Sequence, residues 1–149
     1  MTTTNHMLTG AVISMAVGQP YLAIPLAILS HFVLDPLPHF GEVGVGKEGY
    51  FSRLKRTVII VDALIAGVVL AWLLIHSHWL AAVCAIAAVS PDFIWIYREV
   101  VIRIKGTVKP RNAFSRFHER IQWGERSWGL IIEIVFAVGM LQVFRSLVS

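Results

Sequence analysis

Histidine and aspartate side chains recur at a four-residue spacing where the first long apolar stretch of this chain ends. They are His31, Asp35 and His39. Because an α-helix brings residues i and i+4 to one face, the spacing predicts that at least His31 and Asp35 point the same way. Imidazole nitrogens and carboxylate oxygens are ligands for Zn²⁺, and Mn²⁺ and Fe²⁺ accept them too. The block therefore predicts a divalent metal site, with zinc as the first choice and manganese or iron as alternatives.

Three further acids interrupt apolar segments of the chain. They are Asp62, Asp92 (which follows Pro91) and Glu133. Ionisable groups in hydrocarbon are expensive to desolvate, so such residues are functional candidates. We expect Asp92 to join the metal site and Asp62 to act as a general base. Glu133 fits a structural hydrogen-bonding role as well as a functional one.

The composition indicates an integral membrane protein of the all-α class. The 149 residues are 56% hydrophobic and only 15% charged, with a mean hydropathy of +0.70. Soluble domains are about 45–50% apolar and about 25% charged. Residues 57–75, 79–97 and 127–148 each approach the ~20 apolar residues that cross a bilayer. We therefore predict one helical transmembrane domain over residues 1–149, with these three segments as spans.

The first apolar segment, residues 7–34, is interrupted and needs a separate interpretation. Gly18-Gln19-Pro20 divides it, and proline suits the first turn of a new helix. The two resulting helices are each too short to cross a bilayer, so they form either one broken span or a re-entrant hairpin. We favour the hairpin, because both helices are too short to cross and the 28 residues together exceed one usual span. This arrangement would return His6 to the level of Asp35.

The basic residues indicate the orientation. Lys and Arg are concentrated in residues 35–56 and 98–126, whereas the turn at 76–78 has neither. The positive-inside rule places both basic connections in the cytoplasm. The three intramembrane acids then lie roughly 8–9 Å below the cytoplasmic surface, at about the level of the histidine block.

The basic connection also predicts an amphipathic helix lying at the cytoplasmic membrane surface. His118 and Glu119 are placed to reach the metal level, as a ligand and as a general base respectively. Arg111, Arg116 and Arg120 can hold a substrate phosphate, or they can anchor the helix on anionic lipid.

Two other partner classes are excluded by the pattern. The net charge of +4 belongs to segments beside the membrane, so it gives no nucleic-acid signal. Gly41 to Lys47 has the spacing of a phosphate-binding loop, but Glu48 follows where Ser or Thr is needed, and no βαβ context is present. We therefore expect neither nucleotide nor nucleic acid as a partner.

The combination of His6, the Asp-x-x-Pro-His block (Asp35 to His39) and a later Pro-Asp pair resembles a known family. It is similar to the small bacterial inner-membrane proteins called membrane-bound metal-dependent hydrolases, and more distantly to zinc-dependent phospholipase C. The resemblance covers roughly residues 5–120. It implies a multi-pass protein of the prokaryotic inner membrane. The metal ligands implied by the resemblance are His6, His31, Asp35, His39, Asp92 and His118.

Two functions from different classes remain open. The leading hypothesis is a hydrolase in which one or two divalent metals activate water at the cytoplasmic face, with a phospholipid or other lipid phosphoester entering from the bilayer. The alternative is a non-enzymatic carrier, in which the same acids handle metal ions or protons. A haem-binding bundle is disfavoured, because only His31 lies inside an apolar segment. The sequence leaves the oligomeric state open.

Overall fold

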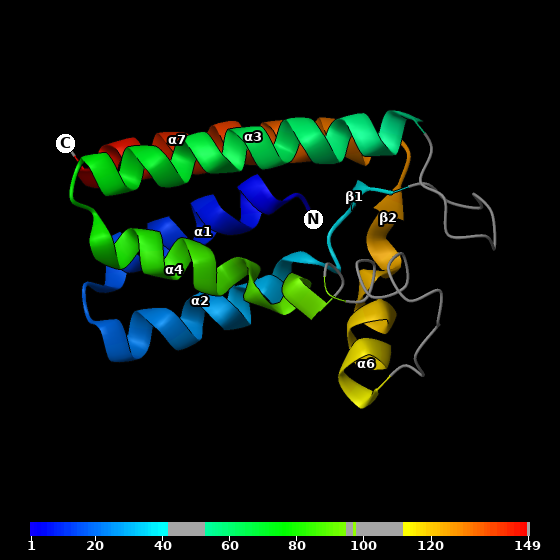
Figure 1. Ribbon diagram of the computed structural model, residues 1–149, viewed down its shortest axis with the longest axis horizontal. Helices are drawn as coiled ribbons and strands as arrows, with labels where there is room; N and C mark the ends of the chain where they lie inside the picture. Colours follow the sequence, from blue (N-terminus) through cyan, green and yellow to red (C-terminus); the bar gives the residue numbers. More distant parts are fainter. Residues whose placement is uncertain (42–52, 95–96, 98–111, 149) are drawn as a thin grey trace.

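Helix α1 (Thr3–Val17) occupies the centre of a helical bundle. The computed structural model describes residues 1–41, 53–94, 97 and 112–148. Within these ranges α1 contacts four other helices, namely α2 (Pro20–Leu34), α3 (Arg53–Ile75), α4 (Trp79–Val89) and α7 (Gly129–Val148). The amino terminus lies inside one end of the bundle, and the carboxyl terminus lies at the opposite end (Figure 1). The all-α fold class is thereby confirmed.

The first apolar segment forms a hairpin of two helices, α1 and α2. Gly18 has a φ of 69°, a left-handed conformation that glycine adopts without a Cβ penalty, and its N–H donates to the Ser14 carbonyl at 2.8 Å. Pro20 then begins α2, where its missing N–H costs nothing. A helix hairpin is present as predicted, and it brings the first turn of α1 beside the last turn of α2. Its re-entrant placement in a membrane stays a prediction.

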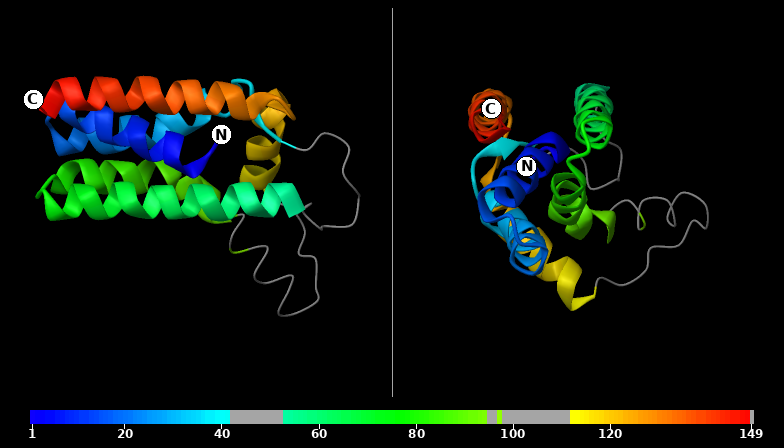
Figure 2. Two further views of the ribbon diagram at one scale, coloured as in Figure 1. Left: turned by 90° about the horizontal axis from the view of Figure 1, so that it is seen from above. Right: turned by 90° about the vertical axis from the view of Figure 1, so that its left-hand side faces the viewer.

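The two longest helices, α3 and α7, flank α1 on two sides (Figure 2). Among the described residues they are the helices long and apolar enough to cross a membrane. They match the segments predicted at 57–75 and 127–148, although α3 begins earlier, at Arg53. Most of their side chains are exposed.

The third predicted span, residues 79–97, is not one continuous helix. Helix α4 ends at Val89, and the 3₁₀ turn η1 (Ser90–Asp92) follows. Pro91 has no N–H to continue the α-helical ladder, and the Ser90 hydroxyl donates to the Ala87 carbonyl at 2.8 Å instead. Helix α4 is therefore too short to cross a membrane, and only two of the three spans predicted besides the hairpin are found among the described residues. The turn directs Asp92 back into the bundle.

Small residues allow α1 and α4 to pack very closely. A Cβ on Gly10 would lie 2.3 Å from the carbonyl oxygen of Cys84, so only glycine fits there. The α4 residues that face α1 and α2 are buried, and they are Ala81, Ala82, Cys84, Ala85 and Ala88. This close approach places the end of α4 and the turn η1 beside the helix hairpin.

A short β-ladder and helix α6 close the end of the bundle where the amino terminus lies (Figure 1). Strand β1 (His39–Phe40) pairs in parallel with β2 (Glu125–Arg126). Helix α6 (Ala113–Ile121) begins at Asn112, whose side-chain oxygen accepts the Ser115 N–H at 2.7 Å, and the 3₁₀ turn η2 (Gln122–Gly124) connects it to β2. Part of the predicted interfacial helix is thus seen as α6, while residues 98–111 lie outside the described residues.

Candidate metal centre

Five ionisable side chains meet where α1, α2, η1 and α6 come together. We call them the His/Asp cluster, and they are His6, His31, Asp35, Asp92 and His118. The three histidines and Asp35 are completely buried, whereas Asp92 keeps 26% of its side chain exposed. The sequence prediction brings these five residues together correctly. Asp92 gives the buried cluster its contact with the exterior.

Asp35 lies at the centre of the cluster and uses both carboxylate oxygens. Its Oδ1 is 3.2 Å from Nε2 of His6. Its Oδ2 is 3.2 Å from Nε2 of His31 and 2.8 Å from Nε2 of His118. Three imidazoles from three different helices therefore converge on one carboxylate.

The charge state of Asp35 follows from these neighbours. Burial alone would raise the pKa of its carboxyl, but hydrogen bonds from His118 and His31, made when these rings carry a proton on Nε2, outweigh burial and hold the pKa well below its usual range. Asp35 is therefore a permanent negative charge inside the bundle.

The tautomer of His31 is fixed by a hydrogen bond outside the cluster. Its Nδ1 lies 2.8 Å from the carbonyl oxygen of Ala88, which only accepts, so Nδ1 carries the proton. In the neutral ring Nε2 then presents a lone pair to the cluster, 3.0 Å from Nε2 of His118. This backbone partner is the outer contact that orients metal-binding histidines in proteins.

The donor atoms form two overlapping groups that could hold a metal ion. One consists of His6, His31 and Asp35, and the other of His31, Asp92 and His118, and in each the ligand atoms lie within 4.8 Å of one another. Lone pairs and negative oxygens this close need a cation between them, either a proton or a metal ion.

The ring of His6 supports the metal interpretation further. Both of its nitrogens are buried. Nε2 lies 3.2 Å from Oδ1 of Asp35 without the geometry of a hydrogen bond, and Nδ1 has no hydrogen-bond partner among the described residues. Buried polar atoms are normally paired, so a cation at Nε2 would satisfy an otherwise orphaned group. The residues present therefore fit a divalent ion with imidazole and carboxylate ligands.

The first turn of α1, which carries His6, is held by the acids Asp62 and Glu133. The Asp62 carboxylate accepts the N–H groups of Thr3 and Thr4 at 2.7 and 3.0 Å, and Oε1 of Glu133 accepts the Thr2 N–H at 2.7 Å. Carboxylates at a helix amino terminus satisfy orphan amides and match the helix dipole. Asp62 thus acts as a cap in the structure, and its predicted role as a general base stays a prediction.

His39 is not brought into either ligand group. Pro36 and Pro38 turn the chain after α2, so that His39 begins β1 instead of continuing the helical face that carries His31 and Asp35. Its Nδ1–H donates to the Leu37 carbonyl at 2.8 Å. Burial, together with the nearby amino-terminal ammonium, lowers the pKa of His39. Its predicted role as a ligand finds no support in this geometry.

The loop that carries His39 nevertheless positions the centre. A Cβ on Gly124 would lie 2.4 Å from the Leu37 carbonyl oxygen, and one on Gly129 would lie 2.1 Å from the His39 carbonyl carbon. The two glycines let the segment after α6 press directly against the loop after α2. This contact helps to keep Asp35, just before the loop, within 2.8 Å of His118 on α6.

The other residues predicted from the basic connection are more dispersed. Arg116 and Arg120 are exposed, and each lies two residues from buried His118, which places them on the opposite face of α6. Glu119 is half-buried on the same helix. Arg111 lies outside the described residues. The two described arginines therefore face away from the cluster.

Two contacts of Asp35 were missed in the sequence. The Met1 ammonium lies 3.0 Å from Oδ1, and the Gln122 amide donates to Oδ2 at 3.3 Å. Gln122 follows His118 by four residues, the same spacing that predicts a shared helical face for His31 and Asp35. The sequence therefore contained a signal for the contact of Gln122. Nothing in the sequence indicates the contact of Met1.

Comparisons with known proteins give no further guidance on the site. No family model matches the chain. Neither the curated proteins nor the solved structures include a significant match.

Proposed function

We propose that this chain is a membrane-embedded, metal-dependent hydrolase acting at the cytoplasmic face, with the His/Asp cluster as its active centre. One observation carries the proposal. Three histidines and two aspartates from separate elements converge in the bundle, and the ring of His31 is oriented by the Ala88 carbonyl so that its lone pair faces the cluster. The resemblance to small bacterial metal-dependent hydrolases is consistent with this assignment.

The proposed membrane placement follows from the two long helices and the charges at their ends. α3 and α7 are long and apolar enough to cross a bilayer. Arg53, Lys55 and Arg56 lie at the start of α3, at the cluster's end of the bundle. Because basic residues stay on the cytoplasmic side, the cluster belongs to the inner leaflet.

Each residue of the cluster has a definite task in this proposal. Asp35 supplies a fixed negative charge, and His31 and His118 supply ring nitrogens on its Oδ2 side. A bound Zn²⁺ lowers the pKa of its water to about 7, which provides hydroxide at neutral pH. Asp92, which is partly exposed, completes the second ligand group with His31 and His118 on the side of the cluster that a substrate would approach.

The proposed substrate is a phospholipid or another lipid phosphoester. A centre in the inner leaflet is open to lipids that diffuse laterally, and a divalent metal held by the His/Asp cluster would supply the Lewis acidity that hydrolysis of a phosphoester needs. Because Arg116 and Arg120 lie on the outer face of α6, we assign them to the headgroup layer, where they hold α6 on anionic lipid.

Metal content is the first test of this function. Protein purified gently under metal-replete conditions should contain stoichiometric metal, and Asp35→Ala and His118→Ala should lose it. His76→Ala is the matched control, because His76 is exposed in the turn at the other end of the bundle. His39→Ala should also keep its metal. Full metal in both cluster variants, or none in the wild type, would remove the proposal.

Lipid turnover is the second test. Wild-type protein in phospholipid micelles should release a soluble headgroup or phosphate, and a chelator should abolish the release. If sealed vesicles show metal or proton flux without lipid turnover, the chain is a carrier that uses the same acids.

A further inference from the structure

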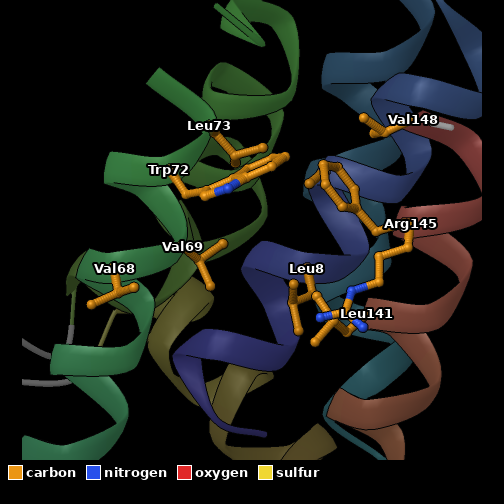
Figure 3. Close-up of a pocket in the computed structure, with 10 residues that line it drawn as sticks. Leu8, Val68, Val69, Trp72, Leu73, Leu141, Arg145 and Val148 are labelled. Atoms are coloured by element: carbon orange, nitrogen blue, oxygen red, sulfur yellow. The ribbon is translucent and has the colours of Figure 1, made fainter. Parts of the chain in front are cut away.

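An apolar groove runs between α3 and α7, with α1 as its floor (Figure 3). Its volume is about 460 Å³, within the range of roughly 300–1,000 Å³ that is typical of ligand sites. The residues that line it include Leu8 and Ala11 from α1, Val68 and Trp72 from α3, and Leu141 and Arg145 from α7.

The groove is separate from the metal centre. Leu8 and Ala11 line it, and at about 100° per residue they lie roughly 200° and 140° around α1 from His6. The cluster and the groove therefore lie on opposite faces of α1. A molecule in the groove would have α1 between it and the His/Asp cluster.

Arg145 is the charged residue among those that line the groove. Its side chain extends into the groove toward Leu8 and Leu141 (Figure 3). No hydrogen bond or ion pair joins it to another residue in the part of the chain that the structure describes. Arg145 is exposed near the end of α7, where its charge stays hydrated. A guanidinium at the edge of an apolar groove favours a ligand that combines an anionic group with an apolar tail.

The position of Arg145 along α7 identifies the leaflet. It lies sixteen residues after Gly129, roughly 24 Å along the helix and away from the end that holds the cluster. Trp72 also lines this part of the groove and stacks on His76, with ring centroids 4.3 Å apart. Tryptophan beside a helix end is typical of the membrane interface. Arg145 therefore lies near the headgroups of the leaflet opposite to the metal centre.

We propose that the groove binds one anionic phospholipid of that opposite leaflet. Its phosphate pairs with the Arg145 guanidinium, whose planar fork matches phosphate oxygens. One of its acyl chains lies over Val68 and Leu8 between α3 and α7. The proposal rests on the membrane placement of the proposed function, and it does not depend on the metal.

Trp72 provides a local probe for the test. The other four tryptophans are replaced by phenylalanine, and the protein is placed in nanodiscs of phosphatidylcholine. Increasing fractions of lipid with brominated acyl chains, either phosphatidylglycerol or phosphatidylcholine, then quench the fluorescence of Trp72. Brominated phosphatidylglycerol should quench at a lower mole fraction than brominated phosphatidylcholine.

Three variants show whether the groove causes this preference. Arg145→Gln should reduce the preference for phosphatidylglycerol by about 5-fold, the effect expected of one basic residue near anionic lipid. Arg56→Gln removes the same charge from the other end of α3 and should leave the preference unchanged. Val68→Phe, at an exposed position of the groove wall, should weaken quenching by both lipids.

Each contrary outcome has a clear meaning. An unchanged preference in Arg145→Gln, or an equal loss in Arg56→Gln, would overturn the proposal. If brominated lipid does not quench Trp72 and light scattering shows a dimer, the groove is instead covered by a second copy of the chain, and the lipid proposal is overturned. Metal content measured on the same samples reports on the His/Asp cluster alone, so failure of one proposal is distinguishable from failure of the other.

Discussion

Replacement of Asp62 tests whether this acid caps α1 or acts as a base. Its carboxylate accepts two backbone N–H groups, at 2.7 and 3.0 Å. Hydrogen bonds to charged groups contribute about 1.5–3 kcal/mol each to stability. Because Asp62 is half-buried, we take the lower limit for each bond. Asp62→Ala should therefore lower the free energy of unfolding by about 3 kcal/mol.

The isosteric variant separates charge from geometry. Asp62→Asn keeps one oxygen acceptor for the first turn of α1 but loses the negative charge that favours the helix amino terminus. It should lower the free energy of unfolding by about 1.5 kcal/mol, half of the effect of alanine. Both variants should also weaken metal binding, because the capped turn carries His6 two residues after Thr4.

Reversible unfolding in mixed micelles, followed by circular dichroism, measures the stability. Thr57→Ala is the matched control on α3, because the exposed Thr57 hydroxyl donates only to the Arg53 carbonyl of its own helix. This variant should lower the free energy of unfolding by less than about 0.5 kcal/mol. If the free energy of unfolding of Asp62→Ala lies within about 0.5 kcal/mol of the wild-type value, the capping role is refuted. Asp62→Asn with full metal and wild-type stability but no lipid hydrolysis would establish the base instead.

Three further predictions follow from other contacts. Metal retention in a chelator-buffered series should fall as the pH drops below about 6.5, because protons compete for imidazole nitrogens; equal retention at both ends of the series would contradict the ligand set. Gly10→Ala should destabilise the bundle by about 1–3 kcal/mol in the same unfolding assay, because its Cβ would meet the Cys84 carbonyl at 2.3 Å; unchanged stability would contradict this packing. In a Cys84→Ala background, Thr3→Cys should react with an impermeant reagent only from the cytoplasmic side; labelling only from outside would refute the re-entrant hairpin.

The helix hairpin and the shared face of His31 and Asp35 could be predicted because local signals specify both. Gly18-Gln19-Pro20 combines a residue that tolerates positive φ with one that begins a helix, so the turn is visible in the sequence. Once the chain turns there, His6 must return to the level of Asp35. The four-residue spacing of His31 and Asp35 predicts the helical face that they share.

The predictions that differ from the structure have two causes. One is an overlooked local signal: counting apolar residues over 79–97 hides the end of α4 before Pro91. The other is contacts with distant elements. The partners of Asp62 are backbone amides of a distant helix, which no side-chain pattern reveals. His39 continues the spacing of the ligands, but the two prolines before it take the chain out of the helix.

The capping of α1 by distant acids has a consequence for how the protein is made. Thr2, Thr3 and Thr4 are synthesised first, yet their backbone amides find their partners on α3 and on α7, the last helix of the chain. His118 also follows most of the bundle in the sequence. During synthesis at the ribosome, the amino-terminal hairpin therefore waits with an incomplete ligand set and uncapped amides. In the proposed function, metal loading would therefore follow the synthesis of α6, which carries His118, and the packing of α7 against the first turn of α1.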